Sequence, residues 1–133
     1  MAASALPGDS PGRRMTDLEA FAAELRQFVA EREWAQFHDP KNLAMLLASE
    51  VGELVAEYRW VAGAAADEHS RAAEPRARIA DEIGDVGIAL VLLCERTGID
   101  LLQAMSDKLE RNRGRYPVAA SRGKAERPER PKD

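Results

Sequence analysis

Two pairs of acidic residues in the chain have the spacing needed to hold a divalent cation. Glu50 and Glu53 form one pair, and Glu82 and Asp85 form the other. The members of each pair stand three positions apart, so both carboxylates of a pair lie on one face of a helix. Acidic pairs at this spacing are also common on solvated helix faces. The spacing alone therefore leaves both interpretations open.

The apolar residues around the two pairs indicate which way the carboxylates face. At roughly 100° per residue, Glu50 lies within or at the edge of the apolar stripe that contains Leu47 and Leu54. Asp85 directly precedes an uninterrupted run of apolar residues and glycine, 86–94. An isolated buried carboxylate is costly or becomes protonated, and four together also repel one another. Such a cluster is tolerated if cations bind within it.

The residue types restrict which ion such a site would take. The chain has two His and one Cys, so the expected ligand set is all oxygen, which suits Mg²⁺, Mn²⁺ or Ca²⁺. Mg²⁺ usually binds one or two protein carboxylates and completes its shell with water and substrate phosphates. Four carboxylates therefore suggest more than one ion and a phosphorylated ligand. A ferritin-type di-iron bundle would need Glu-x-x-His on two helices, and neither pair contains His.

The segments that must position these residues all have helical patterns, and no segment alternates as a strand would. The predicted helices run from Thr16 to about Glu33, from Pro40 to about Val61, from Pro75 to Thr97, and from Asp100 to the residue before Pro117. Residues 62–74 lack periodicity and are predicted as a loop. The sequence thus predicts an all-α, four-helix fold in one domain, 15–117, between disordered tails at 1–14 and 118–133.

Local signals mark the helix boundaries. Thr16 and Glu19 form a capping box at the first helix. Asp39 followed by proline is typical of an N-cap and first turn. Gly98 ends the third helix, and Asp100 caps the fourth.

The apolar run 86–94 indicates that the domain does not stand alone. A helix that is apolar on every side must be buried on every side, and four helices of this size cover such a helix poorly. We therefore expect a second chain to complete the core. Gly84 and Gly87 would permit a close helix approach there, although a helix can also simply tolerate glycine.

Composition excludes several other classes of protein. The 133 residues carry 19 Lys and Arg against 23 Asp and Glu, a net charge of −4, whereas a binder of long nucleic acid would show a basic surplus. No apolar run approaches the ~20 residues that cross a bilayer, and no secretory signal is evident. Cys94 is the one cysteine, which excludes an internal disulfide, and a buried thiol there should be inert. We expect a cytoplasmic protein without membrane contact.

The acidic pairs and several further motifs together resemble a known family. The all-α nucleoside triphosphate pyrophosphatases of the MazG-like superfamily are similar in three segments: Glu50-Val-Gly-Glu53-Leu54, Glu82-x-x-Asp85, and Lys108-x3-Asn112-x2-Arg115-Tyr116-Pro117. Three more segments are similar to the dCTP pyrophosphatase branch: Glu33-Trp34-Ala35-Gln36-Phe37-His38, Pro40-Lys41-Asn42-Leu43, and Arg59-Trp60. The resemblance covers roughly residues 16–118.

This resemblance implies Mg²⁺-dependent hydrolysis of a nucleoside triphosphate to the monophosphate and pyrophosphate, in a homo-oligomer that is a dimer or tetramer. It implies that the metal ligands are Glu50, Glu53, Glu82 and Asp85, with Asp85 also near the substrate. It further implies that a nucleotide-site segment is formed by Trp34, Ala35, Gln36, Phe37 and His38, and that Trp60 contacts the base. The chain departs from animal members at Leu25 and Ala89, where they carry histidine and tyrosine, so the base is less constrained than the chemistry.

Several roles remain open between two interpretations. Lys108, Asn112 and Arg115 share one helix face and would bind the β- and γ-phosphates, or their cations complement the helix dipole. A tryptophan such as Trp34 stacks on a base or belongs to the core. His38 contacts substrate or steers the turn that follows it.

Two classes of function follow from these patterns. The first is a pyrophosphatase for dCTP or modified dCTP, with Glu53 as the hypothetical acceptor of the water's proton; a broader or dUTP-directed activity is the alternative within this class. The second is a non-catalytic helical interaction module. Such a module does not require carboxylates within an apolar stripe, and this position favours the enzyme.

Overall fold

The computed structural model describes residues 18–126 and contains helices and no strand within that range. The four long helices are α1 (Leu18–Glu31), α2 (Pro40–Ala56), α4 (Ala73–Thr97) and α5 (Leu101–Arg115). The short ones are η1 (Trp34–Phe37), η2 (Gly63–Ala65), α3 (Ala66–Arg71) and α6 (Val118–Ser121). The predicted all-α, four-helix fold is confirmed. The tail at 1–14, the capping residue Thr16 and residues 127–133 lie outside the described part.

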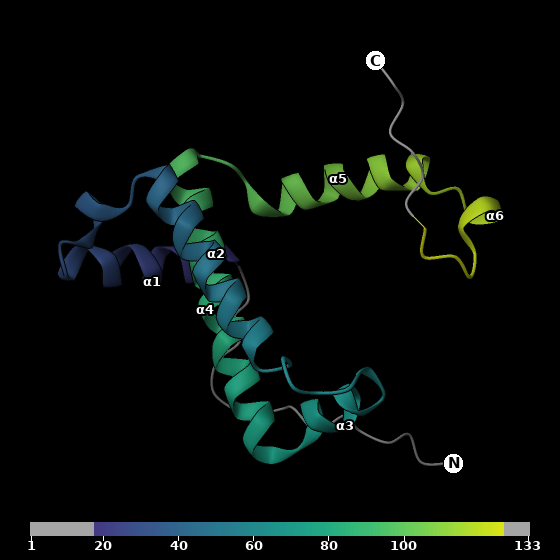
Figure 1. Cartoon of the computed structure of the whole chain (residues 1–133). Helices are drawn as coiled ribbons and strands as arrows, with labels where there is room; N and C mark the ends of the chain where they lie inside the picture. Colours follow the sequence, from purple (N-terminus) through teal and green to yellow (C-terminus); the bar gives the residue numbers. More distant parts are fainter. Residues whose placement is uncertain (1–17, 127–133) are drawn as a thin grey trace, which may run out of the picture.

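An antiparallel pair of helices, α2 and α4, forms the centre of the molecule (Figure 1). Leu43 on α2 and Ala89 on α4 are each only 1% exposed. Ile79, near the other end of α4, is also buried. The two helices are therefore packed along most of their common length, which fixes the register between side chains on facing turns.

Helix α1 crosses the pair and packs on the second half of α4 (Figure 1). Ala22, Leu25 and Val91 form a buried cluster there, and Arg26 forms an ion pair with Glu95. Leu25 is thus a core residue. Since Ala89 is also buried, both positions at which the chain departs from animal family members serve packing here.

The caps predicted at Asp39, Asp100 and Gly98 are present. Asp39 Oδ1 accepts a hydrogen bond of 2.9 Å from the backbone N–H of Asn42 at the start of α2. Asp100 Oδ1 accepts one of 2.8 Å from Gln103 N at the start of α5. Gly98 ends α4 with φ +70°, a left-handed conformation that glycine adopts without a steric penalty.

The segment after α2 differs from the prediction. Helix α2 ends at Ala56, five residues earlier than expected, and the predicted loop 62–74 contains α3. Two bonds hold α3 against the end of α2: Tyr58 and Ser70 join through their hydroxyls at 2.7 Å, and His69 Nε2 donates to the Glu57 carbonyl at 3.0 Å. These partners are twelve residues apart, so local periodicity carries no sign of them.

Helix α5 projects away from the α2–α4 pair and makes no extended contact with another helix of residues 18–126 (Figure 1). Leu102, Met105 and Leu109 are about half exposed along it. The apolar run 86–94 is only partly covered, with Ala89 and Val91 as its buried members. No helix in 18–126 has the length and apolar character to cross a membrane. Beyond α5, the short helix α6 lies in the stretch that the sequence predicts as a tail.

Candidate metal and nucleotide site

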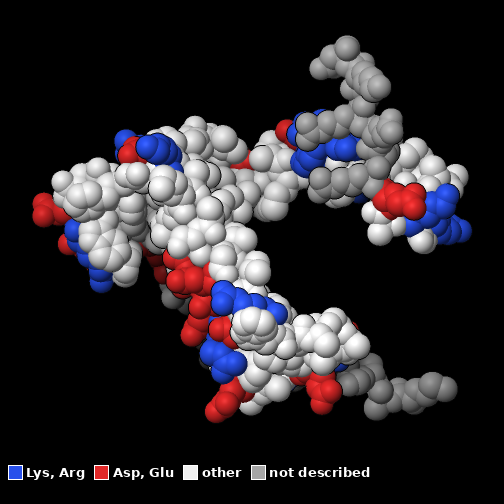
Figure 2. All heavy atoms as spheres, viewed as in Figure 1, with Lys and Arg blue, Asp and Glu red and all other residues white. Residues whose placement is uncertain are grey.

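The α2–α4 pair brings all four predicted carboxylates together. One oxygen each from Glu50, Glu53, Glu82 and Asp85 lies within 4.8 Å of the other three. Glu50 and Glu53 come from α2, and the other two residues come from the facing turns of α4. Figure 2 shows acidic side chains gathered along this pair, with basic side chains beside them towards α3.

The acidic cluster is partly shielded from solvent. Glu50 and Glu82 are partly buried, whereas Glu53 and Asp85 are exposed. The Oε2 atoms of Glu50 and Glu82 are shielded from solvent and have no hydrogen-bond partner. Buried polar atoms without a partner are rare in native proteins and require an explanation. A cation bound between the carboxylates would give both atoms a partner.

The electrostatics of the cluster point the same way. The pKa of Glu50 is raised above its ordinary value, first by burial, then by a hydrogen bond to Glu53 and the negative charges of Glu53, Asp85 and Glu82. Burial is also the main cause of the raised pKa of Glu82, followed by the charges of Glu53 and Asp85. Without a counter-ion, the protein therefore resists full ionisation of these two carboxyl groups.

These residues fit a hard divalent cation. All four side chains offer oxygen, which Mg²⁺, Mn²⁺ and Ca²⁺ prefer. The two exposed members leave one side of the cluster open to water or to a ligand's phosphates. The arrangement is therefore suited to hold cations and a phosphorylated ligand together.

The predicted aromatic segment lies on the surface beside α1. The chain reverses at Glu33, which has a left-handed φ of 53°. Trp34 then returns against Phe28 with ring centroids 5.7 Å apart, and the Arg32 guanidinium lies 3.6 Å from the Phe28 ring centroid. Trp34 remains substantially exposed. Trp34 is therefore not a core residue of this single chain.

The rest of this segment is open as well. Ala35, Gln36 and Phe37 are exposed, and His38 is partly buried. Gln36 bonds to the Glu33 carbonyl, and the Phe37 carbonyl accepts from the Asn42 side chain at 3.1 Å. Hydrogen bonds to two backbone carbonyls thus hold the segment in place, while the Phe37 ring stays exposed.

Trp60 is the most exposed large apolar residue in the described part, at 90%. The Arg59 guanidinium lies 6.0 Å from its ring centroid. The short connection after α2 carries both residues, and α3 braces that connection. A tryptophan left this open is available to a ligand or to another chain.

The three predicted phosphate-binding residues are not brought to the carboxylates. Lys108, Asn112 and Arg115 lie on α5, which projects from the α2–α4 pair (Figure 1). Lys108 and Asn112 line a shallow hollow with Met105 and Leu109. Within one chain these side chains share a face, as predicted, but they do not form part of the acidic site.

Sequence reasoning missed an ion pair at the edge of the cluster. Arg78 Nε donates to Glu57 Oε2 at 3.0 Å, joining α4 to the end of α2. The signal was present in the spacing: Glu57 follows Glu53 by four residues, and Arg78 precedes Glu82 by four. In two antiparallel helices this places them on the next facing turns.

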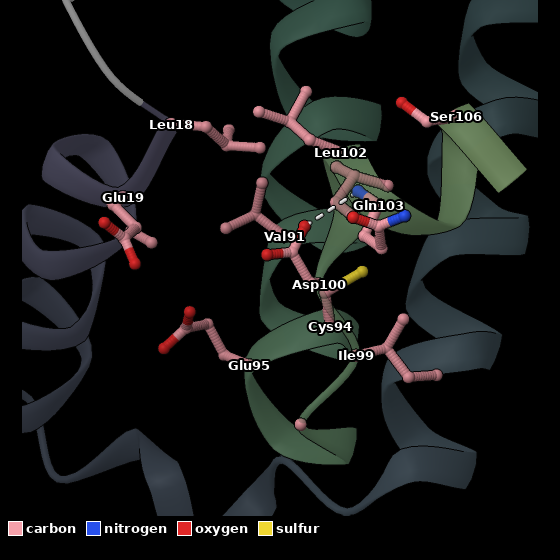
Figure 3. Close-up of a pocket in the computed structure, with 13 residues that line it drawn as sticks. Leu18, Glu19, Val91, Cys94, Glu95, Ile99, Asp100, Leu102, Gln103 and Ser106 are labelled. Atoms are coloured by element: carbon pink, nitrogen blue, oxygen red, sulfur yellow. Dashed lines mark hydrogen bonds between the residues drawn. The ribbon is translucent and has the colours of Figure 1, made fainter.

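A separate cavity of about 600 Å³ lies between α1, the end of α4 and the start of α5 (Figure 3). Cys94 and Asp100 line it, and none of the four clustered carboxylates does. Cys94 is half-buried rather than deeply buried. Its thiol pKa is raised by burial and by the charges of Glu95 and Asp100, which agrees with the inert thiol predicted.

Comparison with known proteins finds relatives over most of the chain. It is 41% identical to dCTP pyrophosphatase 1 of Rattus norvegicus over 116 residues, 87% of this chain and 66% of that protein. It is 38% identical to dCTP pyrophosphatase 1 of Homo sapiens over 113 residues, 85% of this chain and 65% of that protein. The chain thus spans slightly less than two thirds of these curated relatives. No family model matches.

A solved structure supports the same assignment. A pyrophosphatase from Archaeoglobus fulgidus superposes with a TM-score of 0.69 at 29% identity, covering 82% of this chain and 99% of that one. This fold and these four carboxylates are consistent with the MazG-like all-α nucleoside triphosphate pyrophosphatases. The curated relatives that the chain resembles are named dCTP pyrophosphatase 1.

Proposed function

We propose that the chain hydrolyses a nucleoside triphosphate to the monophosphate and pyrophosphate with Mg²⁺, and that dCTP or a modified dCTP is its substrate. The observation that carries this proposal is the convergence of four carboxylate oxygens within 4.8 Å on two packed helices. The relatives named dCTP pyrophosphatase 1 support the choice of nucleotide.

The four carboxylates would hold the cations, more than one per site. Mg²⁺ bound there neutralises phosphate charge and lowers the pKa of a bound water. Glu53 is exposed and contacts both half-buried glutamates, so it can face an incoming water. In the reaction, the water oxygen bonds to the α-phosphorus and its proton passes to the Glu53 carboxylate. The bond from the α-phosphorus to the bridging oxygen breaks, and the electron pair leaves with pyrophosphate.

The nucleoside would bind on the side of the cluster that faces η1. Trp34 offers an exposed ring there, with Ala35, Gln36, Phe37 and His38 around it. Stacking on a base contributes about 1–3 kcal/mol per base. Trp60, on the connection after α2, is the second candidate for contact with the base.

The active form would be a homo-oligomer. The half-covered run 86–94 and the exposed apolar residues of α5 both need a partner, and an isolated helix of 15 residues is marginal in water. A Cβ added at Gly84 or Gly87 would meet nothing within 4 Å, so α4 has an open, close-approach surface. A substrate role for Lys108, Asn112 and Arg115 requires a second copy, since they lie away from their own chain's cluster.

Pyrophosphate release tests this function directly. The full chain is incubated with Mg²⁺ and a panel of dCTP, 5-substituted dCTP, dUTP and the other nucleoside triphosphates. We expect release from dCTP or its modified forms, and none after chelation of the metal. Release from dUTP or from many substrates equally would favour the broader alternative. No release from any nucleotide, together with no Mg²⁺-dependent rise in melting temperature, would favour the interaction module and overturn the proposal.

A further inference from the structure

The Glu57–Arg78 ion pair continues the acidic cluster by one turn on each helix. On α4, Arg78, Glu82 and Asp85 stand at i, i+4 and i+7 and so share one face. On α2, Glu57 follows Glu53 by one turn, and its charge contributes to the raised pKa of Glu82. Along the pair, a basic side chain therefore follows directly after the carboxylates.

The ion pair with Glu57 engages only one of the guanidinium nitrogens of Arg78. Only its Nε donates to Glu57, and Glu57 is the one partner that Arg78 has among residues 18–126. The Arg78 side chain is 53% exposed, whereas that of Glu57 is 19% exposed. Glu57 thus anchors the guanidinium through Nε, and the terminal nitrogens have no partner among residues 18–126. A guanidinium held this way matches a phosphate in two-point geometry.

Charge and direction identify what those N–H groups would bind. Two divalent ions would balance the four carboxylates, so the charge of a bound triphosphate would call for a further cation beside the cluster. The exposed ring of Trp34 lies beyond the start of α2, and Arg78 lies at the opposite end of the cluster. A nucleotide with its base towards Trp34 and its α-phosphate at the carboxylates would direct its β- and γ-phosphates towards Arg78. Trp60 follows Glu57 by three residues, so it would then contact the base only from a second copy of the chain.

We propose that Arg78, oriented by Glu57, binds the β- and γ-phosphates of the substrate and the pyrophosphate that leaves. The assignment rests on the proposed pyrophosphatase function. In the ground state Arg78 holds the end of the triphosphate, and as the bond to the α-phosphorus breaks it contacts the group that receives the electron pair. Glu57 is a positioning residue and touches no substrate.

The test compares pyrophosphate binding with turnover in the full chain. Calorimetry measures the affinity for Mg²⁺-pyrophosphate and for dCMP, and kinetics give KM and kcat for dCTP. A hydrogen bond to a charged group contributes enough for an about 10- to 150-fold change in affinity. Arg78→Ala should therefore weaken pyrophosphate binding at least about tenfold and raise KM for dCTP, with dCMP affinity unchanged. Arg78→Lys should recover part of both losses, because it keeps the charge without the fork.

Two further variants separate binding from a merely structural ion pair. Glu57→Gln keeps the shape of the anchor but not its charge, and it should weaken pyrophosphate binding less than Arg78→Ala does. Arg76→Ala removes an exposed arginine two positions away on α4 and should change neither affinity. If Arg78→Ala and Glu57→Gln lower only the melting temperature and leave pyrophosphate affinity and KM unchanged, the inference is overturned while the pyrophosphatase stands. If the unmodified chain neither binds pyrophosphate nor releases it from any nucleotide, both fail.

Discussion

The central helix pair and helix α5 carry the two sets of charged residues, and the structure treats them differently. The carboxylates of α2 and α4 meet because two packed helices hold them in register. Lys108, Asn112 and Arg115 share a face of α5, but within residues 18–126 no helix packs along α5. Spacing within one helix predicts which side chains lie together on that helix. Only packing between helices decides what those side chains face.

The largest effect should follow from loss of a cluster carboxylate. Glu50→Gln or Asp85→Asn should reduce turnover by more than about a hundredfold, since even an outer-shell partner of a metal typically contributes 10- to 100-fold. Helix content by circular dichroism should be unchanged. Asp81→Asn, an exposed carboxylate beside Glu82, is the matched control and should retain activity. Full activity in both cluster variants would show that the pair is not the catalytic region.

A smaller effect tests whether α5 serves the site of another copy. Lys108→Ala should raise KM for the triphosphate about tenfold, the usual loss for a charged hydrogen bond. Arg111→Ala, on another face of α5, should not. Mixing Lys108→Ala with Glu50→Gln protein should then restore part of the turnover, because one site in the mixed oligomer keeps both regions intact. No recovery, with equal KM in both α5 variants, would remove α5 from the site.

The acidic cluster should make the stability of the α2–α4 pair depend on pH. The folded chain binds protons at Glu50 and Glu82 more tightly than the unfolded chain, because both pKa values are raised above 4.5. Without divalent ions, stability should therefore fall as pH rises from 4.5 through those raised values. At neutral pH, Mg²⁺ at a hundred times its Kd should add about 2.7 kcal/mol, and this gain should shrink on acidification as protons compete.

Thermal melting at several pH values, with and without Mg²⁺, measures both trends. Glu50→Gln should flatten the metal-free profile and reduce the gain from Mg²⁺. A metal-free chain whose stability rises across the same pH interval would contradict the description of a partly shielded acidic cluster.

The smallest effect compares the two helix caps. Asp39→Ala removes the cap of the packed helix α2 and should lower the free energy of unfolding by about 1 kcal/mol. Asp100→Ala removes the same bond from α5, where the loss should appear as local fraying. Hydrogen exchange of the amides of α5, beside chemical denaturation of the whole chain, separates the outcomes. Equal losses of global stability would mean that α5 is packed as firmly as α2.

Much of the fold was predictable because its signals are local. Asp39 with its proline, Gly98 and Asp100 each mark a boundary through bonds within a few residues. Helix α3 was not predictable, since it is held by Tyr58 and His69 through bonds spanning twelve residues.

The acidic site was predictable for a different reason. Glu50 and Glu82 belong to pairs that face the apolar side of their helices, so packing those sides together brings the carboxylates together as well. Arg78 was missed because its spacing to Glu82 indicates a pairing with Glu57 only once the register between α2 and α4 is known, and no local pattern fixes that register. The direction of α5 was not predictable either, because within residues 18–126 no helix packs along it.

The turn at Gly98 has a mechanical consequence for helix α5. Only Gly98, Ile99 and Asp100 separate α4 from α5, and α5 is about 22 Å long at 1.5 Å per residue. A small rotation at this turn therefore moves the far end of the helix a long way: a tilt of about 10° at Gly98 would displace it by about 4 Å. Because a side chain at Gly98 is strained at φ +70°, one substitution at this position would re-aim every charge that α5 carries.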